Sequence, residues 1–90
     1  MKQVKNNPDA GRFELKEGDF TAYIEYKIKD NKYYLISTQV PEELSGQGIG
    51  SRLLKGSLEL IEKSGYKVVP VCSFVSGWFE RHPGKSELLA

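Results

Sequence analysis

The sequence predicts a mixed α+β domain, with an antiparallel three-stranded meander, a long helix, a strand parallel to the meander and a short C-terminal helix. Three observations support this order. Residues 20–29 alternate between apolar and polar side chains, as a half-buried strand does. Residues 49–64 carry apolar side chains at three- and four-residue spacing, which is typical of an amphipathic helix. Between these two segments, residues 44–52 read LSGQGIGSR and hold three of the nine glycines.

The composition is that of one small globular domain spanning residues 1–90. Hydrophobic residues make up 39% of the chain and charged residues 28%. The formal net charge of +1 argues against a dedicated nucleic-acid binder, and no apolar run approaches the roughly 20 residues that span a membrane. Cys72 is the only cysteine, so no internal disulfide can form. With a polar N-terminus that lacks an apolar signal segment, this favours a cytoplasmic protein.

The meander is predicted to begin after a loose lead-in of residues 1–11. Residues 6–9 read NNPD, which is a turn signal. From Arg12 to Leu15, polar and apolar side chains begin to alternate, which predicts a first strand. A tight turn at residues 17–19 then leads into the second strand.

A two-residue hairpin turn joins the second and third strands. Asp30 and Asn31 both tolerate the positive φ angles that such a turn requires. The return strand, residues 32–40, is rich in Tyr, Ile, Thr and Val, and Pro41 ends it.

The long helix of residues 49–64 is predicted to end at Gly65, which lies where a C-terminal glycine cap belongs. Gly56 in its middle costs about 0.5–1 kcal/mol relative to Ala, and we interpret it as a point of close packing against the sheet. The strand–helix–strand connection requires the following strand to pair in parallel.

The C-terminal part is predicted to hold a short buried strand and a second helix. The strand covers residues 66–71, and because Pro70 cannot donate a ladder hydrogen bond, the strand splays or ends there. Residues 73–81 form the helix, with aromatic and aliphatic side chains at helical spacing. Residues 84–90 are predicted to be a weakly ordered tail.

The glycine turn places several backbone N–H groups at a helix N-terminus, which is an arrangement suited to phosphate. It does not fit the two common nucleotide motifs. A Walker-type loop needs Lys and Ser/Thr after its last Gly, whereas Gly50 is followed by Ser51 and Arg52. The dinucleotide fingerprint needs a Gly where Ser51 stands, and its fold begins with that turn.

The x-G-x-G-x-G pattern after an antiparallel meander resembles the coenzyme A pyrophosphate loop of the GNAT acetyltransferases. Gly48 and Gly50 match the two small positions of the family's pattern, and Ser45 stands where Arg or Gln is usual. Residues 12–83 as a whole resemble the minimal, single-domain GNAT-like proteins of the YjdJ-like branch. The matching stretches include TQVP at residues 38–41 and VPVCSFV at residues 69–75.

The resemblance implies acetyl-CoA or coenzyme A as the cofactor. Backbone N–H groups of residues 47–51 are expected to hold its pyrophosphate, and Arg52 is either a further charge contact or a solvated helix residue. By resemblance, the backbone of residues 38–40 pairs with the pantetheine arm. The predicted cofactor-binding residues are Thr38, Gln39, Val40, Ser45, Gly46, Gln47, Gly48, Ile49, Gly50, Ser51, Arg52, Phe74 and His82.

Cys72 is the predicted catalytic residue. It follows the last strand and precedes a helix N-terminus, a location that can lower the pKa of a thiol. By resemblance it lies near the acetyl group, either as a nucleophile that takes the acetyl first or as a hydrogen-bond donor in direct transfer. The alternative is a buried structural cysteine.

His82 is the only histidine, and it either acts as a general base or ends the last helix near the nucleotide end of the cofactor. The acids that could serve as a base, or simply be solvated, are Glu25, Glu42 and Glu43.

The sequence therefore predicts an acetyl-CoA-dependent N-acetyltransferase that acts on an amine of a small molecule or a protein. A module that binds acyl-CoA or CoA with little turnover is the alternative, and a purely structural α+β domain is a third interpretation. We expect no bound metal, no nucleic acid and no membrane partner, and either a monomer or a homodimer.

Overall fold

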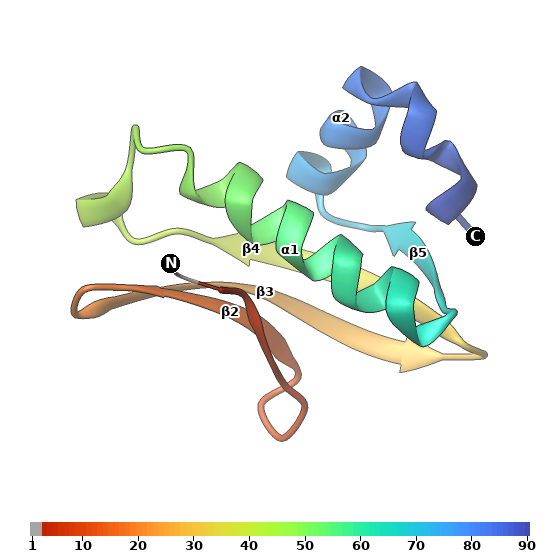
Figure 1. The fold of residues 1–90 in the computed structure, drawn as a ribbon, viewed down its shortest axis with the longest axis horizontal. Coiled ribbons are helices and arrows are strands. Elements are labelled where there is room, and N and C mark those ends of the chain that lie inside the picture. The colour runs from red at the N-terminus through yellow and green to blue at the C-terminus, as the bar shows by residue number, and fades with distance from the viewer. Residues whose placement is uncertain (1–2) are drawn as a thin grey trace.

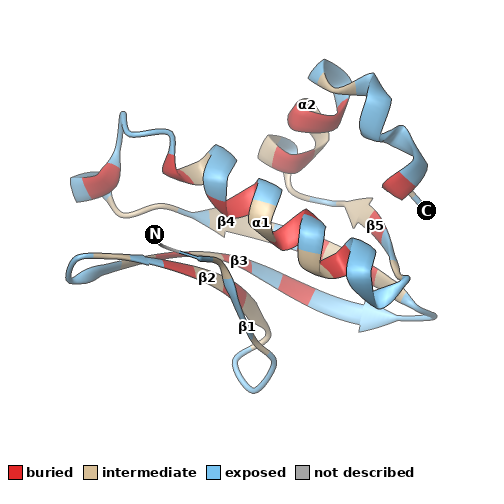
Figure 2. Cartoon of the chain, viewed as in Figure 1, coloured by how far each residue is buried: buried red, intermediate tan, exposed pale blue. Residues whose placement is uncertain are grey.

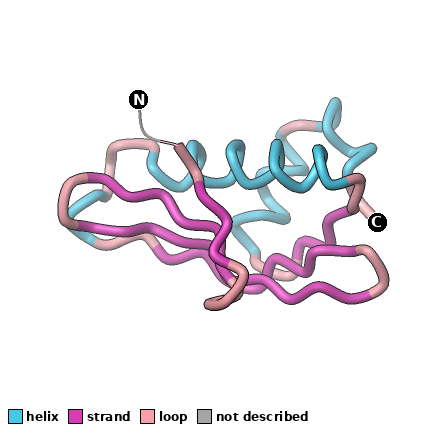
Figure 3. Tube along the Cα trace, turned by 60° about the horizontal axis from the view of Figure 1, so that its bottom comes forward, coloured by secondary structure: helices cyan, strands magenta, loops and turns pink. Residues whose placement is uncertain are grey.

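The computed structural model describes residues 3–90, which form a single five-stranded sheet with helices on one face (Figure 1). The strands lie in the order β1-β2-β3-β4-β5; the first four are antiparallel and β4 pairs with β5 in parallel. Figure 3 shows the strands in one layer and the helices in another. The strands are β1 (Lys5–Asn7), β2 (Arg12–Glu17), β3 (Phe20–Lys29), β4 (Lys32–Gln39) and β5 (Lys67–Pro70). The helical segments are η1 (Glu42–Leu44), α1 (Ile49–Ser64), α2 (Ser73–Arg81) and η2 (Pro83–Leu88).

The predicted α+β architecture is confirmed, including the parallel pair around the long helix. Both predicted helices have the bounds that the sequence periodicity indicated. The hairpin turn is also confirmed, because Asp30 and Asn31 have φ angles of 53° and 61°. Gly65 caps α1 in the left-handed conformation, with a φ of 79°.

The meander has four strands and not three, so the prediction of a loose lead-in is wrong for its described part. β1 pairs with β2, with Lys5 opposite Glu14. Tertiary contacts hold this polar strand, including a hydrogen bond from the Tyr26 hydroxyl to the Asn6 side chain. Three residues with no apolar alternation give no strand signal in the sequence, which is why the prediction missed it. Residues 1 and 2 of the predicted lead-in lie outside the described residues.

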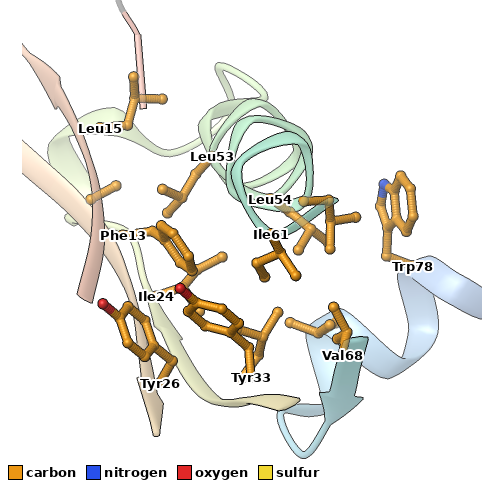
Figure 4. Close-up of a cluster of buried hydrophobic side chains, with 14 of the residues drawn as sticks. Phe13, Leu15, Ile24, Tyr26, Tyr33, Leu53, Leu54, Ile61, Val68 and Trp78 are labelled. Atoms are coloured by element: carbon orange, nitrogen blue, oxygen red, sulfur yellow. The ribbon is translucent and has the colours of Figure 1, made fainter. Parts of the chain in front are cut away.

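The core lies between α1 and the sheet face that it covers (Figures 2 and 4). Phe13, Ile24 and Leu35 reach it from the strands, and α1 contributes a stripe that includes Leu53 and Ile61, all with exposed fractions of 1% or less. Each such side chain stabilises the fold by about 1.5–3 kcal/mol when fully buried. The opposite sheet face carries no helix in the described chain, so half of the alternating residues of the strands remain in contact with solvent.

Gly56 packs closely, as predicted, but its partner is Val4 and not the sheet. A Cβ atom on Gly56 would clash with Cγ2 of Val4. Val4 belongs to the segment before β1, which therefore lies directly against α1. Gly56 therefore leaves room for the Val4 side chain, which occupies the space where a Cβ atom would lie.

The C-terminal tail is ordered, which corrects the prediction of a weakly ordered segment. Residues after α2 form η2, whose Leu88 is buried in the core. Leu89 makes a parallel bridge to Val68, and the backbone N–H of Ala90 donates to the Val68 carbonyl at 2.9 Å. These contacts partly cover the outer edge of β5 and stabilise a short strand that is otherwise paired on one side only.

A gap between β4 and β5 opens where their pairing stops. The last register pair is Leu35 with Pro70, and the N–H of Cys72 then donates to the Leu35 carbonyl at 2.9 Å. Ile36 is the extra residue of a β-bulge, because Glu25 faces Ser37 while Tyr26 faces Leu35. From there β4 continues to Gln39 without β5 beside it. Within residues 3–90, no helix is both long enough and apolar enough to cross a membrane.

Candidate functional site

The N-terminus of α1 has no protein cap. The N-cap residue is Gly48, no side chain accepts a hydrogen bond from the first turn, and the first turn holds no acidic residue. The first intrahelical hydrogen bond runs from the Arg52 N–H to the Gly48 carbonyl at 3.1 Å. The preceding N–H groups, those of residues 49–51, therefore have no acceptor within the helix. Together with the positive end of the helix dipole, they form an arrangement that favours an anion.

The three glycines of this turn are required for different reasons. Gly46 and Gly48 have φ angles of 78° and 68°, in the left-handed region where other residues are strained. Gly50 has an ordinary φ angle, but a Cβ atom there would lie 3.2 Å from Cζ of Phe74. The first two glycines shape the turn, and the third lets the Phe74 ring of α2 approach the backbone of α1.

Cys72 lies at the gap between β4 and β5, and it is the N-cap residue of α2. Its Sγ lies 3.5 Å from Oγ1 of Thr38, and either atom could donate the hydrogen bond. The residue is half-buried and packs against the core. The structure thus brings together Thr38 of β4 and the cysteine predicted to be catalytic, although the two are 34 positions apart in the chain.

The environment of Cys72 lowers the pKa of its thiol. Burial alone raises the pKa, because it disfavours the charged thiolate. Hydrogen bonds from the Thr38 side chain and from the backbone of Val75, Phe74 and Thr38 outweigh burial. The backbone contributions from Val75 and Phe74 come from the first turn of α2, whose dipole also favours a negative charge at this position. A lowered pKa raises the fraction of Cys72 that is thiolate at a given pH.

Phe74 connects the glycine turn to Cys72. It lies two residues after Cys72, and its ring touches Gly50. The turn, the Phe74 ring and the Thr38–Cys72 pair therefore form one continuous site at the ends of α1, α2 and β4. Ser45 and Gln47 are exposed beside this site, and Gln39 and Val40 extend it along the end of β4.

Arg52 lies on the first turn of α1, and its guanidinium is 3.5 Å from a carboxylate oxygen of Glu17. Glu17 ends β2, so this ion pair links the helix start to the turn between β2 and β3. About half of the Arg52 side chain, 49%, remains exposed. Sequence patterns could not identify Glu17 as its partner, because the two residues are far apart in the chain.

His82 is not close to Cys72. The two residues cap opposite ends of α2, which places them roughly 15 Å apart at 1.5 Å per helical residue. The His82 ring stacks on Trp78 with a centroid distance of 4.0 Å, and Nδ1 lies 2.8 Å from the Trp78 carbonyl oxygen. A carbonyl oxygen only accepts, so Nδ1 carries the hydrogen. This position excludes His82 as a base at the Cys72 gap.

The side chain of His82 lines a separate cavity of about 240 Å³ between α1 and the C-terminal segment. Its lining includes Lys55 and Lys85, the carboxylates of Glu59 and Glu62, and the apolar side chains of Leu58, Trp78 and Leu88. Neither Thr38 nor Cys72 lines this cavity.

Among the acids proposed as bases, Glu25 alone has a hydrogen bond to the strand that carries Thr38. The Ser37 hydroxyl donates to Oε1 of Glu25 at 2.8 Å. Glu42 and Glu43 lie in the short helical turn η1 and are exposed. The Glu25–Ser37 pair was not predicted, because the bulge at Ile36 that sets this register has no sequence signal.

A family model and a solved structure both relate this chain to the same protein family. Residues 12–88 match the family model of the GCN5-related N-acetyl-transferases. The NMR solution structure of a GCN5-like protein from Staphylococcus aureus is similar over 98% of this chain and 87% of its own, with a TM-score of 0.74 and 25% sequence identity. The family match includes the meander from β2 onward, the glycine turn, both α-helices and Cys72.

Proposed function

Because the chain belongs to the GCN5-related N-acetyltransferase family, we propose that it transfers an acetyl group from acetyl-CoA to an amine. The observation that carries this proposal is the uncapped N-terminus of α1, where Gly50 lies against the ring of Phe74, two residues after Cys72. A structural domain would gain stability from a capping side chain there, typically about 1 kcal/mol. The free N–H groups make sense as binding groups for an anionic ligand. The match to the family also supports an enzyme over a module that only binds CoA. We further propose that the chain belongs to the minimal, YjdJ-like branch of the family.

The residues of the site divide into two binding functions. Backbone N–H groups of residues 47–51 hold the pyrophosphate of the donor, and Ser45, Gly46 and Arg52 border them. The backbone of residues 38–40, which has no strand partner beyond the gap, pairs with the pantetheine arm, and the Phe74 ring packs beside it. His82 could contact only the nucleotide end, given its distance from Cys72. The donor supplies an activated acetyl thioester.

Cys72 acts at the acetyl group, and the structure favours the thiolate for this function. In the covalent route, the Cys72 sulfur forms a bond to the acetyl carbon and the CoA thiolate leaves. The amine nitrogen then attacks the same carbon, loses its proton to solvent, and the Cys72 thiolate leaves. In the direct route the amine nitrogen attacks the acetyl carbon of the donor thioester, the CoA thiolate leaves and the nitrogen loses its proton to solvent, while the Cys72 thiol donates a hydrogen bond. Thr38 keeps the sulfur in place in both routes.

The decisive experiment combines calorimetric titration with acetyl-CoA and CoA, assays of CoA release with a panel of amines, and mass spectrometry. Binding together with amine-dependent CoA release supports the proposal. Acetylation of Cys72 in the absence of amine indicates the covalent route, and its absence during turnover indicates direct transfer. Cys72→Ala should lower turnover at least tenfold without abolishing binding. No binding at millimolar acetyl-CoA would overturn the proposal.

The cytoplasm is the proposed location, since a single, half-buried free cysteine suits a reducing compartment.

A further inference from the structure

Three lysines lie directly opposite one another across β3, β4 and β5. The register places Lys29 opposite Lys32, and Lys32 opposite Lys67. We call these residues the lysine row. Like charges at directly opposite positions destabilise a sheet. Among residues 3–90 the ion pairs are Arg12–Glu14 and Arg52–Glu17, so no carboxylate neutralises the row. Only Lys67 has a polar contact, from Nζ to the Glu87 carbonyl oxygen at 2.6 Å.

Lys29 and Lys32 of the lysine row lie on the face of the sheet that no helix covers. Tyr33 and Val68, the neighbours of Lys32 and Lys67 in the chain, are buried beneath the helices. Because successive side chains of a strand point to opposite faces, Lys29 and Lys32 point the other way. The Lys67 ammonium instead turns to the Glu87 carbonyl of η2, at the edge of β5. Lys27 lies on the same face as Lys29 and Lys32, opposite Tyr34. Three positive charges are therefore collected on this face, at the end of the sheet that carries the β3–β4 hairpin.

An apolar strip continues from the lysine row toward the Cys72 gap. It consists of Tyr34, Ile36, Val69 and Val71, on the same uncovered face. Ile36 and Val71 are exposed to 37% and 57%. Val71 directly precedes Cys72. The apolar strip thus connects the positive charges to the site.

A negative charge lies beside the gap. The Glu25 carboxylate, held by Ser37, has no ion-pair partner among the described residues. Arg12 lies opposite it but is occupied, since its guanidinium pairs with Glu14 at 2.8 Å and stacks 4.3 Å above the Tyr23 ring. Along β4 the uncovered face therefore changes from positive to apolar to negative.

We propose that this face docks an extended, acidic segment of a protein acceptor, whose acidic residues contact the lysine row and whose lysine enters the Cys72 gap. This rests on the proposed acetyl transfer. Lys32 and Ser37 are five residues apart, which is roughly 16 Å along a strand. An extended segment covers the same distance in about five residues, so its acidic side chains lie about five positions from its acceptor lysine. Glu25 then attracts the ammonium group before the neutral amine reacts.

Charge complementarity favours a peptide segment with acidic residues and a lysine over a nucleic acid or an anionic membrane. A nucleic acid or an anionic membrane would have to place phosphates over Glu25 and Glu14 as well as over the lysine row. The chain's formal net charge of +1 gives such partners little long-range attraction. A segment with an acidic end and a basic end matches both ends of the face.

The test uses labelled peptides with two glutamates five and six positions from one lysine, made in both chain directions, with Thr and Val between them. Matched peptides carry glutamines in place of the glutamates. Fluorescence anisotropy reports binding to the CoA-saturated protein, and CoA release reports turnover. We expect at least one acidic peptide to bind at least tenfold more tightly than its glutamine counterpart. Lys29→Gln/Lys32→Gln should remove that difference, while Lys5→Gln/Lys63→Gln, with the same charge change elsewhere, should keep it.

Equal binding of acidic and glutamine peptides in both directions would overturn the proposal, as would an unchanged preference in Lys29→Gln/Lys32→Gln. Stronger binding of an anionic vesicle or a DNA duplex than of the acidic peptides would assign the face to that partner and overturn it too. The binding assay is independent of catalysis. A protein that prefers the acidic peptide but acetylates no amine contradicts the proposed function alone. A protein that acetylates simple amines without this preference contradicts the docking alone.

Discussion

The thiol of Cys72 and the hydroxyl of Thr38 lie 3.5 Å apart at the point where β4 and β5 separate. The contact depends on the parallel pairing that ends at Leu35 and Pro70, and on the hydrogen bond from the Cys72 N–H to the Leu35 carbonyl. These two features fix the sulfur at the start of α2, where backbone groups of the first turn also reach it. The reactivity of the cysteine is therefore a property of the junction between strand and helix.

Thr38→Val should raise the pKa of Cys72. Among the groups that lower this pKa the Thr38 side chain has the largest effect, and valine keeps the shape without the hydroxyl. The rate of alkylation by iodoacetamide, measured against pH, reports the thiolate fraction, and its midpoint should move to higher pH in the variant. Ser76→Ala, one turn along α2, serves as a control that leaves the midpoint in place. A midpoint that is the same in Thr38→Val and wild type would contradict the assigned cause.

The lowered pKa of Cys72 also makes stability depend on pH. The folded pKa lies below the ordinary value of 9.0, so between the two values the unfolded chain binds more protons than the folded protein. The free energy of unfolding should therefore rise with pH through this window, and the contribution is lost as pH falls through the folded pKa. Urea denaturation at several pH values should show this rise in wild type and not in Cys72→Ala. If the free energy of unfolding depends on pH in the same way in wild type and Cys72→Ala, the prediction is wrong.

Gly48→Ala should weaken acetyl-CoA binding at least tenfold. Gly48 has a φ of 68°, and open space surrounds the position of a Cβ atom, so the change acts through backbone strain and not through a clash. An alanine in the left-handed region costs about 1–2 kcal/mol, and relaxing that strain turns the N–H groups of the first turn away from the ligand. Calorimetric titration measures the affinity. Gly84→Ala, at an ordinary φ with equal space, is the matched control and should bind as wild type does.

Gly56→Ala should destabilise the fold, although alanine favours a helix by about 0.8–1 kcal/mol. The new methyl group would clash with the Val4 side chain, which forces the segment before β1 away from α1. Overpacking of this kind costs about 1–3 kcal/mol and outweighs the helix propensity. Val4→Ala should relieve the clash, so the double variant should be more stable than the sum of the single changes indicates. If the changes in unfolding free energy of Gly56→Ala and Val4→Ala simply add in the double variant, measured by urea denaturation, the two residues are not in contact.

The regular elements with long, strong periodicity could be predicted from the sequence alone. The apolar stripe from Ile49 to Ile61 fixed α1, and Asp30-Asn31 indicated the hairpin turn. β1 could not be predicted, because three polar residues form a strand only when Tyr26 and β2 are already in place. The ordered tail escaped prediction for the same reason, since Leu88 and Leu89 become structural only against the core and Val68.

The site was predictable where it depends on local chain geometry. Three glycines before a helix indicated the turn, and Cys72 between a strand and a helix indicated its place at the N-terminus of α2. Contacts between distant segments were not predictable, as with Arg52 and Glu17 or Glu25 and Ser37. The distance of His82 from the gap follows from the length of α2, which the spacing of apolar side chains in residues 73–81 predicted.

Lys32→Gln should stabilise the protein at low ionic strength. Lys32 lies directly opposite Lys29, so removing its charge relieves this like-charge pair, with an effect of about 0.2–1 kcal/mol. At about 1 M salt the Debye length falls to about 3 Å, and the gain in unfolding free energy should largely disappear. Urea denaturation at low and high salt measures both values, with Lys63→Gln on α1 as the control. A salt-independent change, or a loss of stability, would mean that the lysines do not repel one another. A gain would show that the protein keeps a row of charges at a cost to its own stability, as a surface retained for an acidic partner would.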